Sequence, residues 1–298
     1  MLNEKRTGLR RVILWALVAA YTIALPDANV VYEAIATHFS LSIARKVPIA
    51  LIILFGVIYI LFGLMTKKSA RYFGLLSPCF IIVYAVISLE PNPNKHIHIP
   101  EYIVMTWLLY AVFSDDYQGN GLFVFIFICS SMLGIVDELE QGIYPSRFYG
   151  WIDMCINSAS SIIGALILYG IKKTPSGGWA WARHLKTLKG PVGAVIYGVI
   201  GAVLMCWYLF DVRTKRIFWS VYPYWLLGLN GIFLALGPVV VFLYWRRFRE
   251  LSHLKDKENR MFYDEAVTAN LWVFSPLTIL FVMHTLVLFI AFSGMEFR

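Results

Sequence analysis

The sequence predicts an all-α fold, a polytopic membrane helical bundle of about nine transmembrane helices with its N-terminus in the cytoplasm. The composition indicates this class, because 59% of the 298 residues are hydrophobic and only 15% are charged. Soluble domains carry about 25% charged residues. The apolar residues also gather in runs, several of them near the length of about 20 residues that a membrane-spanning helix needs. A soluble globular protein is therefore excluded.

The expected helices follow one another with short polar connections. The apolar runs cover residues 12–25, 47–65, 73–89, 101–113, 121–136, 156–171, 191–210, 222–245 and 269–291. The fourth run is short, which indicates either a transporter-like binding site or a helix whose polar ends lie among lipid head groups. Between the first two runs, residues 26–45 have the spacing of an amphipathic helix on the membrane surface. An ordinary connecting loop is the alternative there.

The chain is expected to divide into three regions. Residues 174–178 read TPSGG, a composition typical of a linker. We therefore expect a six-helix membrane domain over residues 1–173, which carries the polar site. A cytoplasmic linker over residues 174–190 and a three-helix membrane region over residues 191–298 follow it.

The basic residues predict the orientation of the chain. Lysines and arginines cluster before the first apolar run and after the second, sixth and eighth runs. Because cytoplasmic loops carry an excess of Lys and Arg, these clusters place the N-terminus inside and the C-terminus outside. The net charge of +8 then reflects membrane topology, and no nucleic-acid partner is expected.

A first polar patch, Asn94–Tyr102, precedes the fourth run. A helix that starts near Pro100 would place Pro100 and Glu101 in its first turn, where both residue types are favourable. In an extended segment His96 and His98 would face the same way, and two imidazoles with a carboxylate could hold a metal. The spacing provides no third ligand, so we predict no metal and no other cofactor.

A second polar patch, residues 137–157, lies between two apolar runs. On helices, Asp137 shares a face with Gln141, and Asp153 shares a face with Asn157. Arg147 is the expected partner of one or more of these acids, because its planar fork matches a carboxylate. Ionisable groups beside hydrocarbon are candidates for function, although a polar network that only pins two helix ends is the alternative.

The predicted topology places both patches on the extracytoplasmic face. Each patch offers the other a counter-charge, and lone charges beside hydrocarbon are costly. We therefore expect Lys95 or His98 to lie within reach of Glu138 or Asp153.

The two patches together resemble the signature of the VanZ-like family of membrane proteins. The similarity covers roughly residues 75–172 and consists of Lys95, His98, Tyr102, Asp137, Glu138, Gln141, Arg147, Asp153 and Asn157. The chain departs from the pattern at Asn94 and Ser160, Glu101 is not part of it, and the last three runs lie outside it. The resemblance implies an integral protein of the cell envelope, in a family with a member associated with glycopeptide-antibiotic tolerance. The expected location is the bacterial inner (plasma) membrane, with the site facing outward.

The preferred functional hypothesis is a membrane-embedded, glycosidase-like hydrolase that acts on a lipid-linked or glycosylated envelope substrate. Glycosidic cleavage needs two carboxylates that flank one bond. Glu138 is the expected nucleophile or base, Glu101 the expected general acid, and Asp153 a further catalytic candidate. The expected substrate-binding residues are Lys95, His96, His98, Tyr102, Asp137, Gln141, Arg147 and Asn157.

Two other functions fit the same residues. A non-enzymatic membrane protein could bind a lipid or glycopeptide head group through them, and a transporter could use the short fourth helix as a gate. The acids lie at a membrane interface and not at mid-membrane, which disfavours the transporter. Membrane lipids and a lipid-linked or glycosylated small molecule are the expected partners.

Overall fold

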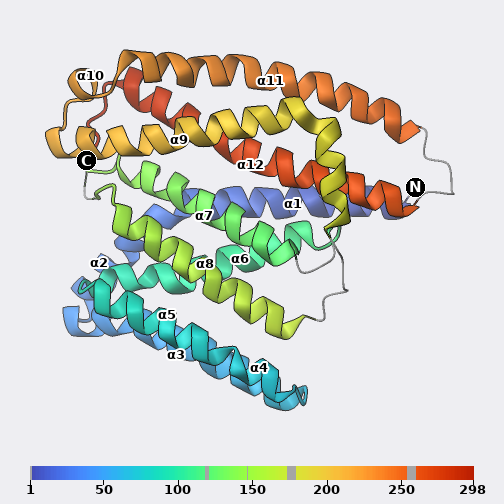
Figure 1. Ribbon diagram of the computed structural model, residues 1–298. Coiled ribbons are helices and arrows are strands. Elements are labelled where there is room, and N and C mark those ends of the chain that lie inside the picture. Colours follow the sequence, from blue (N-terminus) through green and yellow to red (C-terminus); the bar gives the residue numbers. More distant parts are fainter. Residues whose placement is uncertain (1, 118–120, 146, 173–178, 254–259) are drawn as a thin grey trace. The chain divides into compact units, whose positions relative to one another are not determined.

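The computed structural model describes residues 2–117, 121–145, 147–172, 179–253 and 260–298 (Figure 1). These residues form α-helices and short 3-10 helices joined by turns, and no strand occurs among them. The predicted all-α helical bundle is confirmed.

Eight helical segments of the described chain are long and apolar enough to cross a membrane, which supports an integral membrane protein. They cover Leu9–His38, Leu41–Met65, Ala70–Leu89, Gly121–Gln141, Trp151–Ile171, Ala180–Lys215, Tyr224–Tyr244 and Glu265–Ser293. The fourth expected span, residues 101–113, lies in a helix of 16 residues, His98–Phe113. That helix would be about 24 Å long, less than the roughly 30 Å of a bilayer core.

The chain folds into two compact units. Unit 1 comprises Met1–Asp137 and Trp151–Ser176, and unit 2 comprises Glu138–Gly150 and Gly177–Arg298. The later boundary falls inside the expected linker, 174–190, of which Ala180–Leu188 is a 3-10 helix, η3. The expected first domain, residues 1–173, includes residues 138–150. The structure instead assigns Glu138–Gly150 to unit 2, although this segment lies in sequence between two stretches of unit 1.

Unit 1 contains the elements that carry the first polar patch. In chain order they are α1 (Leu2–Ala24), η1 (Leu25–Asp27), α2 (Ala28–His38), α3 (Leu41–Met65), α4 (Ala70–Gly74), α5 (Leu76–Leu89), η2 (Pro93–Ile97), α6 (His98–Phe113), α7 (Gly121–Gln141, in this unit to Asp137) and α8 (Trp151–Ile171). Figure 1 shows α6 beside α8, and these two helices pack closely on one another in the described chain. Helix α6 also packs against α1, and α8 packs against α5.

The stretch 26–45 is not one amphipathic helix. It is divided into η1, α2 and the start of α3. The break follows from Ser40, which has extended backbone angles and accepts the backbone N–H of Ile43 on its side chain at 3.2 Å. This is an N-cap, which starts a new helix and thereby ends the old one.

Small side chains bring the helices of unit 1 together. A Cβ at Gly164 of α8 would lie 2.8 Å from the Thr106 side chain of α6, so glycine permits their close approach. A Cβ at Gly134 of α7 would lie 2.9 Å from Asn157 Cβ of α8. The hydroxyls of Ser130 and Ser161 are hydrogen-bonded at 2.8 Å and join the same two helices. Helices α6, α7 and α8 therefore form a tight framework for the polar residues at their ends.

Unit 2 is built around three long helices that pack on one another, α9 (Lys189–Lys215), α11 (Tyr224–His253) and α12 (Arg260–Ser293), with the short α10 (Phe218–Val221) between α9 and α11. Its centre contains a buried polar group: His284 contacts Asn230 Oδ1 at 3.0 Å and the carbonyl oxygen of Gly198 at 3.1 Å. The residues 138–150 complete this unit.

Candidate functional site

A short 3-10 helix presents the first polar patch. Its N-cap is Asn92, whose side chain accepts the Asn94 backbone N–H at 3.1 Å. Helix α6 starts directly afterwards at His98, with Pro100 and Glu101 in its first turn. The predicted helix start is confirmed, and it places Lys95, His98 and Tyr102 within two turns of one another.

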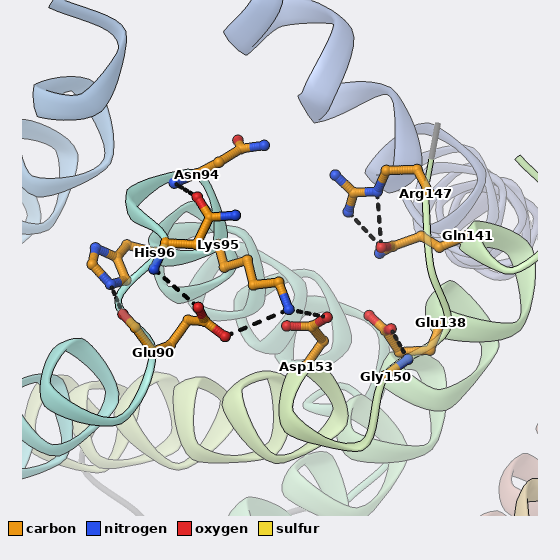
Figure 2. A network of polar contacts seen from close by, with 10 residues as sticks. Glu90, Asn94, Lys95, His96, Glu138, Gln141, Arg147, Gly150 and Asp153 are labelled. Atoms are coloured by element: carbon orange, nitrogen blue, oxygen red, sulfur yellow. Dashed lines mark hydrogen bonds and ion pairs between the residues drawn. The ribbon is translucent and has the colours of Figure 1, made fainter. Parts of the chain in front are cut away.

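Lys95 lies between two carboxylates of unit 1 (Figure 2). Its Nζ is 2.9 Å from Asp153 Oδ2 and 3.5 Å from Glu90 Oε2. Glu90 and Asp153 are 7% and 4% exposed. Burial alone would lower the pKa of Lys95, but the hydrogen bond and charge of Asp153, together with Glu90, raise it above its ordinary value. The expected contact between the two polar patches is therefore confirmed by the Lys95–Asp153 pair.

Helix α8 carries two buried acceptor oxygens, Asp153 Oδ1 and Asn157 Oδ1. Asp153 uses one carboxylate oxygen for Lys95, and its Oδ1 is buried without a hydrogen-bond partner in the described part of the chain. Asn157, fully buried one turn later, donates from Nδ2 to the Gly134 carbonyl at 3.4 Å, while its Oδ1 has no such partner among the described residues. Buried polar atoms are nearly always hydrogen-bonded, so these two oxygens need donors that the described residues do not supply.

Two further pairs of unit 1 involve predicted site residues. The hydroxyl of Tyr102 donates to Asp137 Oδ2 at 3.1 Å, and both residues are fully buried. His98 Nδ1 lies 2.9 Å from Glu101 Oε2. These residues join α6 to α7 and fix the start of α6.

Residues 96–98 are not extended, because η2 and the start of α6 are helical there, so the condition under which His96 and His98 would face the same way is not met. His96 donates from Nε2 to the Glu90 carbonyl at 2.8 Å, whereas His98 contacts Glu101. The two imidazoles have separate partners. Among the described residues, no group of three or more His, Cys, Asp or Glu side chains is arranged to hold a metal ion.

Unit 2 contributes the predicted residues Glu138, Gln141 and Arg147. Glu138 is fully buried and accepts the Gly150 backbone N–H on Oε2 at 3.2 Å. Figure 2 shows the Arg147 guanidinium directed at the Gln141 side chain, and its Nε donates to Gln141 Oε1 at 3.0 Å. The expected pairing of Arg147 with an acid is wrong in the described chain, because an amide oxygen of the same turn satisfies it.

The sequence reasoning missed two features of the site. No role was expected for Glu90, although an acid that directly follows an apolar run and precedes Lys95 is a signal for a charge pair. The last residues of the chain hold the 138–150 turn of unit 2: Tyr149 N donates to Arg298 O at 2.8 Å, and Arg298 N donates to Gly142 O at 2.9 Å. A Cβ at Gly142 would lie 2.2 Å from the Phe297 ring. No local pattern predicts this long-range contact.

Scans of the chain against protein-family models, curated proteins and solved structures find no match.

Proposed function

We propose that unit 1 binds the hydroxyl-rich head group of a lipid-linked molecule, and that a glycosyl group is the chemistry that suits it best. The observation that carries the proposal is the pair of buried acceptors on α8, Asp153 Oδ1 and Asn157 Oδ1, which lack a partner in the described chain. An unmade hydrogen bond of a buried charged group costs about 1–3 kcal/mol or more. A ligand that supplies two donors would recover that free energy.

The charges around these acceptors support a neutral, donor-rich ligand. Lys95 already has two carboxylate neighbours, Asp153 and Glu90. A phosphate or carboxylate ligand would therefore meet two acids for one cation. Adjacent sugar hydroxyls are donors without net charge, and they can reach two acceptors that stand one helical turn apart.

A lipid-linked ligand is favoured by the setting of the cluster. Unit 1 contains apolar segments that are long enough to cross a membrane. The cluster is formed by the ends of helices, at η2, the start of α6 and the start of α8. Helix ends are where a lipid places its head group. We further propose a bacterial plasma membrane and an outward-facing site, as the basic residues and the VanZ-like resemblance predict.

Hydrolysis of a glycosidic bond is the second candidate function, and the variety of carboxylate environments favours it. Asp153 forms an ion pair with Lys95, whereas Glu101 contacts His98, a group that can share a proton. Carboxylates in different environments can act as base and acid. Glu138, which belongs to unit 2, is the nucleophile or base that the sequence alone predicts. A non-enzymatic binder is the alternative, and turnover measurements distinguish the two.

Removing the acceptor charge at Asp153 should weaken binding of a sugar head group. In lipid nanodiscs, with sugar-based detergents avoided, Asp153→Asn should lower the affinity for methyl glycosides about tenfold or more, because a hydrogen bond to a charged group contributes about 1.5–3 kcal/mol. Calorimetric titration of a panel of methyl glycosides measures this change. Asn157→Leu, which removes the second acceptor, should act in the same direction.

Asp115→Asn is the matched control. Asp115 forms an ion pair with Arg10 at 2.9 Å and lies beyond the far end of α6, about 24 Å from the start of that helix. Its substitution should leave glycoside binding unchanged. Failure of every glycoside to bind wild-type protein, or equal effects of the two Asp→Asn changes, would contradict the proposed function.

The outward-facing orientation is tested by labelling a single introduced cysteine. Cys155 is the exposed native thiol and the other three are buried, so Cys155→Ser provides a background. Asn92→Cys in that background should react with a membrane-impermeant maleimide in intact cells. Reaction only after lysis would place the cluster on the cytoplasmic side.

A further inference from the structure

Unit 1 contains a pocket of about 390 Å³ whose lining does not include the proposed head-group acceptors Asp153 and Asn157. It lies where α1, α2, α3, η2 and α6 meet, and this volume falls within the range of small-molecule sites. Most of its lining is apolar and includes Ile35 of α2, Leu51 and Phe55 of α3, and Val104 of α6. An apolar pocket of this kind in a membrane protein is a place for hydrocarbon.

One part of the lining is polar and includes Asn94 and Glu101, beside the tyrosines Tyr21 and Tyr32. Asn94 donates from Nδ2 to Asn29 Oδ1 at 2.6 Å, but its Oδ1 is buried without a hydrogen-bond partner in the described chain. Glu101 also lines the pocket. Neither Lys, Arg nor His occurs among the described residues that line it. This part of the pocket therefore suits a hydrogen-bond donor and does not suit a phosphate.

The pocket is next in sequence to the Lys95 cluster, which consists of Lys95, Glu90 and Asp153. Asn94 lines the pocket, and the next residue, Lys95, pairs with Asp153. Likewise Glu101 lines the pocket and contacts His98. The short helix η2 and the start of α6 therefore carry both the polar cluster and one wall of the pocket. A ligand with a polar head and a hydrocarbon chain could occupy the two together.

We infer that this pocket binds the hydrocarbon chain of a membrane lipid, with a hydroxyl of that lipid at Asn94 and Glu101. The inference rests on the proposed function for the identity of the head group, since it assigns the chain of the same ligand. It divides recognition into two subsites, an apolar one between α2 and α3 and a polar one at the ends of α6 and α8. The apolar subsite then selects the hydrocarbon chain of the lipid, and the polar subsite selects its head group.

The subsite is tested with a long-chain alcohol that carries a photoreactive diazirine near the end of its chain. Ala28 of α2 lines the pocket, whereas Ala34 of the same helix is exposed and does not line it. In nanodiscs, the alcohol should label peptides of α2 and α3 in wild-type protein. Ala28→Phe should reduce this labelling several-fold because the ring fills the pocket, and Ala34→Phe should leave it unchanged.

A second pair of variants tests the pocket independently, in case Ala28→Phe impairs folding. The side chains of Val30 and Val31 are similarly exposed, at 63% and 59%, but Val31 lines the pocket and Val30 does not. Val31→Trp should lower the labelling, and Val30→Trp should not. Retained thermal stability of both proteins shows that the loss is local.

Two further labelling experiments test this inference separately from the proposed function. The alcohol carries no sugar, so Asp153→Asn should leave its labelling unchanged even where glycoside binding is lost. An alkyl phosphate of the same chain should label less, because the polar part of the pocket lacks a cation. Labelling spread evenly over the exposed apolar helix faces, indifference to both pocket variants, or equal labelling by the phosphate would overturn the inference.

Discussion

If the protein is the proposed hydrolase, replacing Glu138 by glutamine is expected to lower the turnover of a lipid-linked glycoside by about 10²–10⁴-fold, the contribution typical of a positioned acid or base. The fold should persist, because Glu138 accepts the Gly150 N–H on its side chain at 3.2 Å and the oxygen of a glutamine amide can accept the same bond. Release of sugar from lipid-linked and aryl glycosides by purified protein measures the effect.

Glu140→Gln is the matched control, because Glu140 lies on the same last turn of α7 but is only half-buried. It should retain turnover. Glu101→Gln should spare aryl glycosides with good leaving groups, since a general acid matters least when the leaving oxygen needs no proton. Tight binding without sugar release by wild-type protein would reject the hydrolase and favour the non-enzymatic binder.

Replacing Lys95 by methionine is expected to destabilise unit 1 and to weaken glycoside binding together. The change leaves Glu90 and Asp153 buried without the cation between them. Losing one partner of a buried pair costs about 3–5 kcal/mol, and we expect about 2 kcal/mol here because the Lys95 side chain is one-third exposed. Thermal unfolding in nanodiscs measures the loss.

The dependence of this loss on pH follows from the pKa of Lys95. Because the pKa of Lys95 in the folded state is raised above its ordinary value of 10.5, the stabilisation is fully present below pH 10.5 and disappears as the pH rises through the folded-state pKa. The stability difference between wild type and Lys95→Met should therefore be constant from pH 7 to pH 9 in nanodiscs.

Two controls identify the ion pair as the cause. Lys46→Met, at an exposed lysine of the same unit, should have little effect on stability. The double variant Lys95→Met with Asp153→Leu should recover part of the loss, since removing both partners leaves fewer unpaired charges. A loss in the double variant equal to the sum of the single losses would show that the two residues do not interact.

Helix patterns and charge arguments predicted the parts of the structure that depend on neighbours in the sequence. The start of α6 followed from Pro100 and Glu101, whose preference for a first turn is a local property. The contact between Lys95 and Asp153 also followed, because a charge beside hydrocarbon needs a counter-charge and few candidates exist.

Contacts that depend on the packed structure could not be predicted in this way. Arg147 donates to Gln141 because the local turn places the amide oxygen of Gln141 next to the guanidinium. A sequence pattern of charges does not show this local contact. Phe297 packs beside the 138–150 turn, and Arg298 forms backbone hydrogen bonds with it, so these contacts join residues more than a hundred positions apart. The pocket has residues of α2 and α3 in its lining, and these two helices are separated by the break at Ser40, where an N-cap divides the expected surface helix.

The most direct test of the central claim is an experimental structure of the protein with a glycolipid bound in a bilayer mimic. We expect sugar hydroxyl oxygens within about 2.5–3.0 Å of Asp153 Oδ1 and Asn157 Oδ1, while Lys95 stays paired with Asp153. A sugar bound elsewhere, with both of these oxygens hydrogen-bonded to the protein itself, would contradict it.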